Sequence, residues 1–340
     1  MRRPAALIAA LIAALAAVPV LAAAPAWAQD PPATGAAEVG TVSFVLENDL
    51  FYNLDRHYTN GVEAAWTSGK AAPAWALGAA AWVPLFPEER LVRTVYRVGQ
   101  AMFTPDDIEV ADPPPGARPY AGWLYASIGL IAESERRLDQ LQLTAGVIGP
   151  LSLAEPSQKL VHRITGAAQP RGWDTQLKNE PGLVVSYQRS WRSFLSERVA
   201  GFGVDVTPHV GGALGNVYTF ADAGLTVRLG RHLPRDYGPP RIEPGVPGSG
   251  FFVPAERWFG WYLFAGVSGR AVARNIFLDG NTWQDSRSVD RELFVGDLQF
   301  GLAATLGDAR LTYTHVLRTR EFDGQDGGDQ FGALAVSWRF

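Results

Sequence analysis

The chain has 340 residues, no cysteine, 36 glycines and 24 prolines, and a formal net charge of −4 at pH 7. Without cysteine it has neither a disulfide framework nor thiolate ligands for zinc, and its acidic balance argues against nucleic acid as a partner. The glycine and proline content favours a protein of many strands and turns over a helical one.

The first 28 residues have the pattern of an export signal. Arg2 and Arg3 form a basic start, residues 5–24 are an apolar run, and a small-x-small cleavage site ends at Ala28. An uncleaved membrane anchor is the alternative, because the apolar run is long. The Ala-x-Ala site favours cleavage after Ala28, which would remove two arginines and change the net charge from −4 to −6.

Residues 29–40 are rich in Pro, Ala and Gly and are predicted to be a short flexible lead. Residues 41–340 then show neither an internal repeat nor a second domain. About twelve segments alternate in polarity like strands. In chain order they are residues 41–49, 58–67, 93–102, 120–132, 140–147, 183–191, 199–207, 217–229, 258–273, 292–306, 310–319 and 330–340.

The fifth segment has the cleanest alternation. Four apolar or small residues share one face: Leu141, Leu143, Ala145 and Val147. The other face carries Gln140, Gln142, Thr144 and Gly146. Apolar-out and polar-in alternation is typical of a membrane barrel, although a soluble β-sandwich in the periplasm would alternate as well. No later segment reaches the roughly 18 apolar residues of a transmembrane helix.

These features predict an all-β fold: a transmembrane antiparallel β-barrel in the Gram-negative outer membrane, formed by residues 41–340. Tryptophans near strand ends would form an interfacial girdle: Trp66, Trp191, Trp258 and Trp338. An even number of strands puts both termini on the periplasmic side. The loops that follow odd strands then lie at the extracellular end of the barrel; they are residues 50–57, 103–119 and 148–180.

The longest of these outward loops contains a predicted short helix. Glu155, Gln158 and His162 have the i, i+3, i+7 spacing that places them on one helix face. Pro156 near the start and Gly166 after the last periodic residue have the positions of helix start and stop signals. A helix carrying glutamine and histidine is an unusual insertion in a strand-rich chain.

Polar residues from four segments should meet at this outer rim. They are Glu47-Asn48-Asp49, Asp55 to Gly61, Gln100 with Thr104 and Arg118, and Gln158, His162, Trp173, Asp174, Gln176 and Asn179 of the insert. Carboxylate and amide oxygens suit a hard cation such as Ca²⁺, and a histidine beside a cation suggests hydrolysis of an ester. No Gly-x-Ser-x-Gly motif indicates a nucleophilic serine.

Each of these residues also has an ordinary structural interpretation. His162 alone would be a surface or loop histidine, and Asn48 and Asp49 would form an Asx-turn at a strand end. Thr59 and Glu63 would line a wet lumen. A porin or a structural barrel without enzymatic activity is therefore the main alternative to a hydrolase.

The motifs together resemble the lipid A 3′-O-deacylase family of outer-membrane proteins, the LpxR type. The motifs that carry the resemblance are Glu47-Asn48-Asp49, Tyr58-Thr59-x-Gly61, Gln100 with Thr104-Pro105, residues 146–150 (Gly-Val-Ile-Gly-Pro), Gln158-x-x-x-His162-Arg163-Ile164 and Trp173-x-x-Gln176. The resemblance runs from the first strand to about Gly182, and more loosely to Phe340.

The resemblance implies a twelve-stranded barrel and a Ca²⁺-dependent carboxylic ester hydrolase. Its substrate would be lipid A of lipopolysaccharide in the outer leaflet, from which it removes the 3′-linked acyloxyacyl group. By position, Asn48 and Asp49 match the cation and active-site pair. Thr59 matches a functional hydroxyl, Gln158 a supporting amide and His162 the general base.

The sequence departs from the family pattern at two places. The family has a lysine–arginine pair in the loop between the third and fourth strands, where this chain has acidic residues within 106–111. A family carboxylate shortly after the histidine is replaced near Ala168. Arg118, Arg163 and Arg171 are the cations that could replace the pair in recognising lipid A phosphates. The sequence leaves the oligomeric state open.

Overall fold

The computed structural model describes residues 40–48, 57–70, 72–88, 90–134, 136–236, 252–253 and 257–340. The predicted signal peptide, most of the predicted flexible lead and Asp49 lie outside the described residues.

The described chain is dominated by antiparallel strands. They are β1 (Gly40–Asn48), β2 (His57–Ser68), β3 (Leu91–Thr104), β4 (Ala121–Glu133), β5 (Arg137–Ile148), β6 (Glu180–Trp191), β7 (Leu195–Val199), β8 (Phe202–Gly215), β9 (Tyr218–Arg231), β10 (Phe259–Asn275), β11 (Phe294–Leu306), β12 (Ala309–Arg318) and β13 (Asp329–Arg339). No helix in this part of the chain is long and apolar enough to cross a membrane.

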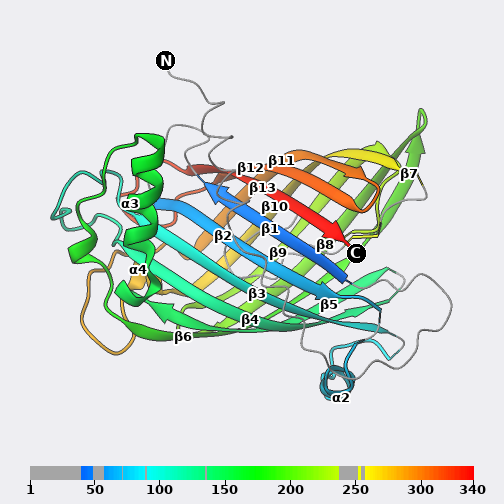
Figure 1. Cartoon of the computed structure of the whole chain (residues 1–340), viewed down its shortest axis with the longest axis horizontal. Helices are drawn as coiled ribbons and strands as arrows, with labels where there is room; N and C mark the ends of the chain where they lie inside the picture. The colour runs from blue at the N-terminus through cyan, green and yellow to red at the C-terminus, as the bar shows by residue number, and fades with distance from the viewer. Residues whose placement is uncertain are drawn as a thin grey trace.

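The sheet closes into a barrel of twelve strands. Each barrel strand pairs with the next one along the chain, except that β6 pairs with β8 and not with β7; β1 pairs with β13. The short strand β7 pairs with β8 alone and extends beyond the barrel as a hairpin (Figure 1). The closed antiparallel barrel predicted from alternation is confirmed.

One predicted strand is wrong in its bounds. We expected a strand over residues 199–207, but Val199 ends β7, and Ala200 and Gly201 form a turn with positive φ. The following strand β8 then continues to Gly215. Its last third contains Gly211 and Gly212, whose missing side chains hide the alternation from a sequence pattern.

Helices lie at both ends of the barrel. The helix α3 (Ala154–Thr165) is flanked by the 3₁₀ turns η2 (Pro150–Ser152) and η3 (Trp173–Thr175), and with α4 (Ile276–Asp279) it lies at the end opposite the C-terminus (Figure 1). A helix that we did not predict, α2 (Ala74–Ala81), lies outside the barrel toward the C-terminal end.

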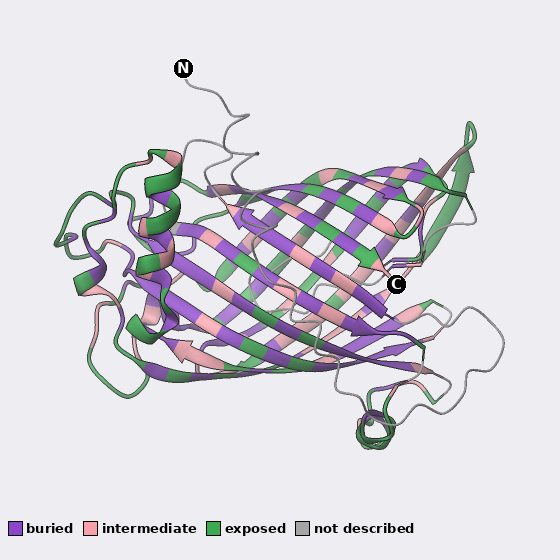
Figure 2. Ribbon diagram, in the orientation of Figure 1, coloured by how far each residue is buried: buried purple, intermediate pink, exposed green. Residues whose placement is uncertain are grey.

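The strands alternate between buried and exposed positions, visible as bands along each ribbon (Figure 2). In β5, Gln140, Gln142 and Thr144 are buried while Leu143 is exposed, as the sequence pattern predicts. The lumen holds buried ion pairs. Arg97 contacts Glu63 at 2.8 Å, and Arg318 contacts Asp297 at 2.8 Å.

The lumen is not polar throughout, which corrects the simple expectation of a wet interior. Toward the α3 end, large aromatic side chains from several strands form a buried cluster with α4. Phe103 stacks on Phe277 with ring centroids 4.1 Å apart, and Tyr58 lies 5.4 Å from Phe103. These rings fill the lumen directly behind the wall that carries the candidate site.

Candidate active site

A cavity of about 500 Å³ lies between α3 and the strands β1 to β4. Seven polar side chains line it: Asn48, Thr59, Asn60, Gln100, Ser157, Gln158 and His162. The cavity therefore brings together the four residues that the sequence nominated for catalysis, Asn48, Thr59, Gln158 and His162.

The cavity is on the outer wall of the barrel, the sheet face directed away from the lumen. Val62 and Val98, which line it, are exposed on that face. Asn60 and Gln100 lie an even number of residues from them and so project from the same face. The polar cluster is thus at the α3 end as predicted, but it faces the surroundings of the barrel.

A β-bulge in β2 adds Thr59 to this face. The register with β3 shifts between Tyr58, which pairs with Phe103, and Asn60, which pairs with Met102. The extra residue breaks the simple alternation, so Thr59 and Asn60 both line the cavity. The Thr59 hydroxyl is 2.7 Å from the hydroxyl of Thr104, and Thr59 is buried.

The helix α3 presents its glutamine and histidine to the barrel. Its buried residues are Ala154, Gln158 and His162, and it ends at Gly166 with φ of 73°. The predicted helix and its glycine stop are confirmed. Glu155 is not on the buried face; its carboxylate pairs with Lys159 at 2.5 Å instead.

Close packing fixes the start of this insert on the wall. A Cβ atom added to Gly122 of β4 would lie 2.1 Å from Ser152 Oγ and 2.3 Å from the Ala154 Cβ atom. Only a residue without a side chain leaves room for the side chains of Ser152 and Ala154 to pack this closely on β4. Nearby, Gln100 Nε2 donates to the carbonyl of Ser152 at 2.6 Å.

The imidazole of His162 is held from its own loop. Its Nδ1 atom lies 2.5 Å from the carbonyl oxygen of Ala168. A carbonyl can only accept, so Nδ1 carries the proton and Nε2 of the neutral ring is a proton acceptor. That tautomer is the one that a general base needs. Here a backbone carbonyl is the group that orients the ring.

The amide of Gln158 is also fixed. Trp173 Nε1 donates to Gln158 Oε1 at 2.8 Å, so the NH₂ end is the donor end of the amide. Trp173 is buried, and its ring lies 5.0 Å from that of Tyr120. The Tyr120 hydroxyl donates to the carbonyl of Ile108 at 3.0 Å. These contacts connect the acidic loop to the helix.

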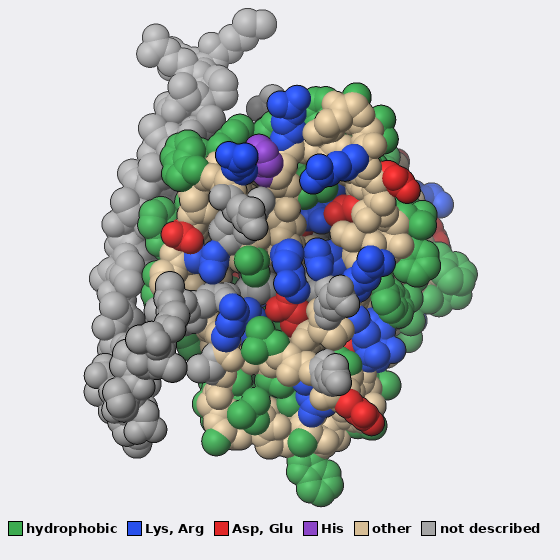
Figure 3. Space-filling model, turned by 90° about the vertical axis from the view of Figure 1, so that its right-hand side faces the viewer, with side chains coloured by type: hydrophobic (Ala, Val, Ile, Leu, Met, Phe, Trp, Pro, Cys, Tyr) green, Lys and Arg blue, Asp and Glu red, His purple; other side chains and the backbone are tan. Residues whose placement is uncertain are grey.

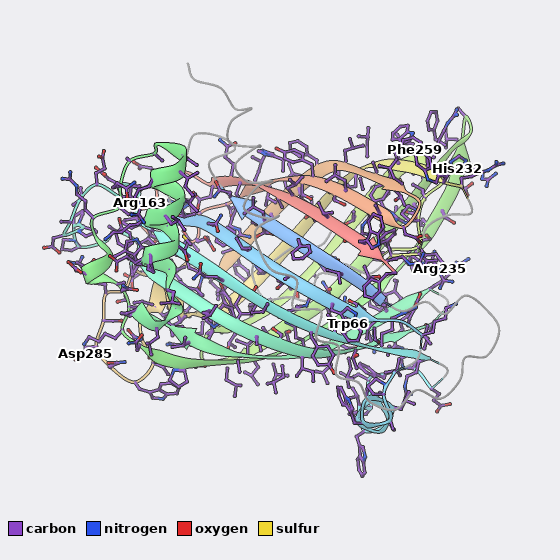
Figure 4. The ribbon with its side chains drawn as sticks, in the orientation of Figure 1. Trp66, Arg163, His232, Arg235, Phe259 and Asp285 are labelled. Carbon is purple, nitrogen blue, oxygen red and sulfur yellow. The ribbon has the colours of Figure 1, made fainter. Side chains whose placement is uncertain are left out.

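Of the three candidate arginines, two are exposed and one is buried. Arg163 is exposed on α3 (Figure 4), and Arg171 is exposed on the insert. Arg118 is buried, and its guanidinium donates to Glu321 at 2.9 Å. Burial by itself raises the pKa of the Glu321 carboxyl, but the charges of Arg118, Arg318 and Arg270 lower that pKa to about 2. Arg118 therefore belongs to a lumen ion pair.

The structure describes only one of the two predicted calcium ligands. Asp49 lies outside the described residues, while Asn48 lines the cavity. Within the described ranges, no three His, Cys, Asp or Glu side chains gather in a way that could hold a metal ion. The donors near Asn48 are amide and hydroxyl groups of Thr59, Asn60 and Gln100. An oxygen-rich set of this kind fits a hard cation and does not fit zinc.

Three supporting residues were not assigned these tasks from the sequence. Gly122, Ala168 and the indole of Trp173 set the position of the helix, the ring and the amide. Trp173 was recognisable within a motif, but Gly122 and Ala168 act through missing or backbone atoms. No side-chain chemistry marks such residues in a sequence.

Fold and site together define a twelve-stranded β-barrel with a polar cavity on its outer wall. The sequence profile of the family described as "Outer membrane protein LpxR" matches residues 11–340. The chain therefore belongs to the LpxR family of outer-membrane proteins. A search of curated protein sequences gave no match.

Solved structures agree in fold. LpxR from Salmonella typhimurium aligns with a TM-score of 0.71 at 19% identity, over 88% of this chain and 100% of that chain. The β domain of the Bordetella autotransporter BrkA gives a TM-score of 0.44 at 11% identity, over 89% of this chain and 99% of that chain. The Salmonella similarity supports the barrel architecture described above.

Proposed function

We propose that this protein hydrolyses the 3′-linked acyloxyacyl ester of lipid A in the outer leaflet of the outer membrane. The observation that carries the proposal is the shared cavity of His162, Gln158, Thr59 and Asn48 on the outer wall of the barrel. The family membership supports the same activity. With the start of β1 and the end of β13 on the periplasmic side, the α3 end of the barrel is extracellular, where lipid A is found.

The cavity has the two chemical zones that such a lipid requires. Below the polar side chains, its wall is apolar and includes Val62, Ala64, Val98 and Leu124. On the other side, α3 contributes Leu160 and Val161, which are exposed. Acyl chains would lie along this apolar wall without leaving the leaflet, while the ester linkage reaches the polar zone.

In the proposed reaction, His162 Nε2 takes a proton from water while the water oxygen attacks the ester carbonyl. The tetrahedral intermediate collapses by breaking the bond to the sugar oxygen, which receives the proton back from the imidazolium. The products are a free 3′-hydroxyl on lipid A and the released acyloxyacyl acid. The contact between His162 and Ala168 supports this assignment because it favours the Nδ1-protonated tautomer.

The neighbouring polar groups would stabilise the oxyanion. The NH₂ group of Gln158 and the hydroxyl of Thr59 are donors in the same cavity. Asn48 and Asp49 are the residues that would hold Ca²⁺. When bound, the cation would add positive charge beside the developing oxyanion. Excess chelator should then abolish release of the acyl group, and full activity in chelator would contradict this assignment.

Recognition of the lipid A phosphates would rest on the exposed cations of the insert. Arg163 and Arg171 are exposed there, whereas Arg118 is engaged with Glu321 inside the barrel. The loop at residues 106–111 is acidic, but Ile108 packs against the insert in a cluster with Trp173. We propose Arg163 and Arg171 as the phosphate contacts in place of the family's lysine–arginine pair.

The test is the lipid A mass spectrum of cells that make the protein or its variants. The His162→Ala variant should leave the 3′-acyloxyacyl group in place because the general base is gone. His232→Ala is a matched control, since His232 is exposed at the opposite end of the barrel (Figure 4). Wild-type deacylation by the His162→Ala variant would contradict the proposal.

A porin is the competing function. The aromatic cluster around Phe103 and Phe277 fills the lumen near the α3 end, which supports the enzyme over an aqueous channel. Planar-bilayer recordings should therefore give no stable conductance steps, while the same preparation releases acyl chains. Stable open-channel currents without deacylation would favour the porin.

A further inference from the structure

The helix α2 packs on the outer wall of the barrel toward the C-terminal end. Its buried residues Ala76 and Ala80 contact a cluster that contains Val92, Leu130 and Ala132. These three positions continue the outward-facing rows of β3 and β4, whose other members nearer the α3 end include exposed residues such as Val98 and Ile128. The helix thus covers a part of the wall that would otherwise contact lipid.

Polar contacts fasten the connection after α2 to the same wall. Asp139 is fully buried on the outward-facing row of β5, where it accepts hydrogen bonds from Arg137 and Arg189. Both guanidinium groups also donate to the carbonyl of Leu85, that of Arg189 at 2.7 Å. Burying the Asp139 carboxylate costs free energy unless its two arginine partners stay in place, and the connection after α2 helps to hold those arginines. These contacts therefore fix the position of α2 on the barrel wall.

The opposite side of this segment is apolar and exposed. Trp82 is 89% exposed, Leu77 is 52% exposed and Trp75 is 46% exposed, with Leu85 also exposed. The helix sequence has neither an acidic residue in its first turn nor a basic one in its last. Such a surface, fixed beside a lipid-facing wall, is continuous with the apolar band of the barrel.

Cations surround the connection at the same end. A cavity bounded by Pro87 of this segment is lined by Lys70, Arg90, Arg136, Arg137 and Arg235, among other residues. Glu133 lines it too and pairs with Arg235 at 3.0 Å. Figure 3 shows lysine and arginine side chains gathered on this end of the molecule. The charge is complementary to anionic lipid headgroups.

We propose that α2 and its connection bind the periplasmic leaflet of the outer membrane. Trp75, Leu77 and Trp82 insert at the boundary between headgroups and acyl chains. The neighbouring cations, Lys70 and Arg136 among them, select anionic phospholipid, for which phosphatidylglycerol is the probe. The site is separate from the cavity at α3 and does not depend on the proposed deacylase activity.

The absence of cysteine from the chain allows a clean depth measurement. The full-length protein with Trp82→Cys is spin-labelled and reconstituted into phosphatidylcholine vesicles that contain phosphatidylglycerol. A label in the leaflet should collide more often with oxygen than with a water-soluble nickel complex. Trp283→Cys is the matched control, because Trp283 is 65% exposed in the loop between β10 and β11 at the other end. We expect the reverse preference there.

The headgroup preference is tested with a second variant. Lys70→Gln combined with Arg136→Gln removes two exposed cations, and phospholipid retained by the purified protein is quantified by mass spectrometry. We expect phosphatidylglycerol enrichment over phosphatidylethanolamine to fall at least about fivefold. Lys178→Gln combined with Arg320→Gln, at the other end, should leave it unchanged.

Two results would overturn the proposal. If the label at position 82 is as accessible to nickel as that at position 283, α2 lies in water and is open to a soluble partner. If the label is in the leaflet but the Lys70 and Arg136 variant retains phosphatidylglycerol like the wild type, selection of anionic lipid is wrong.

Discussion

The orientation of His162 is the residue-scale feature on which the proposed chemistry depends. The backbone carbonyl of Ala168 accepts a hydrogen bond from Nδ1 of His162, at a position where the family resemblance led us to expect a carboxylate. A neutral carbonyl fixes the tautomer but stabilises the imidazolium less than a carboxylate would. The Ala168 carbonyl therefore orients the ring without placing a full negative charge beside it.

This difference can be tested by restoring the charge. In Ala168→Glu, a carboxylate near Nδ1 favours the imidazolium and raises the pKa of the ring. The acidic limb of the kcat/KM profile should then move to higher pH by about one unit. Gln169→Glu adds the same charge one residue farther along and is the control. An unchanged profile in Ala168→Glu would mean that this residue does not face the base.

At the scale of elements, the insert functions only if α3 lies directly on the wall. The approach of β4 to the start of α3 depends on Gly122, and the hydrogen bond from Gln100 to Ser152 holds the same junction. The bulge at Thr59 supplies the facing donors from β2. None of these elements forms the site by itself; the site forms where α3 contacts β2 and β4.

Gly122→Ala should displace the insert because the added methyl overlaps Ser152 and Ala154. We expect kcat/KM for deacylation to fall about 10- to 100-fold, as for a shift of about 1 Å in a catalytic group. Gly269→Ala in β10 is the matched control, since a Cβ atom there meets no heavy atom within 4 Å. Both variants should keep the heat-modifiable gel mobility of a folded barrel.

At the scale of the whole molecule, a closed sheet and a network of buried charges hold the protein together. The pairings of β1 with β13 and of β6 with β8 leave the barrel without free edges, so each of its twelve strands is hydrogen-bonded on both sides. Near the α3 end, Glu321 connects the loop after β12 with Arg118 before β4. This ion pair spans the mouth of the barrel directly behind the site.

The stability contribution of Glu321 should depend on pH in a defined direction. Its pKa is lowered from an ordinary value of 4.5 to about 2. The ionised carboxylate therefore stabilises the folded state fully above pH 4.5, and this contribution is lost as the pH falls toward 2. At pH 7, Glu321→Gln should lower the free energy of unfolding by about 3 kcal/mol, because the buried Arg118 loses the carboxylate with which it pairs.

Urea unfolding in detergent at several pH values measures this effect. The difference between wild type and Glu321→Gln should shrink steadily between pH 4.5 and 2. Glu292→Gln is the control, since its pair with Arg320 at 3.3 Å is largely exposed and contributes less than about 1 kcal/mol. A pH-independent difference would mean that Glu321 acts through packing and not through charge.

The sequence by itself determined the barrel and the helix that bears His162. Alternation of polarity is a local property of each strand, and Gly166 marks the end of α3 whatever surrounds it. The family resemblance of the motifs also nominated Asn48, Thr59, Gln158 and His162, which line one cavity. The helix α2 was missed because its alanine-rich sequence lacks the polar face that makes a surface helix recognisable.

Only the tertiary structure decided which way the site faces and what orients it. Three features depend on segments distant in the chain or on backbone atoms. They are the bulge that turns Thr59 outward, the contact of Gly122 with the insert, and the carbonyl of Ala168. The same is true of Arg118, which the sequence offered as a contact for lipid A phosphates but which pairs with Glu321 inside the barrel. These contacts form only when the barrel closes, because closure brings together residues that are far apart in the sequence and that no local pattern connects.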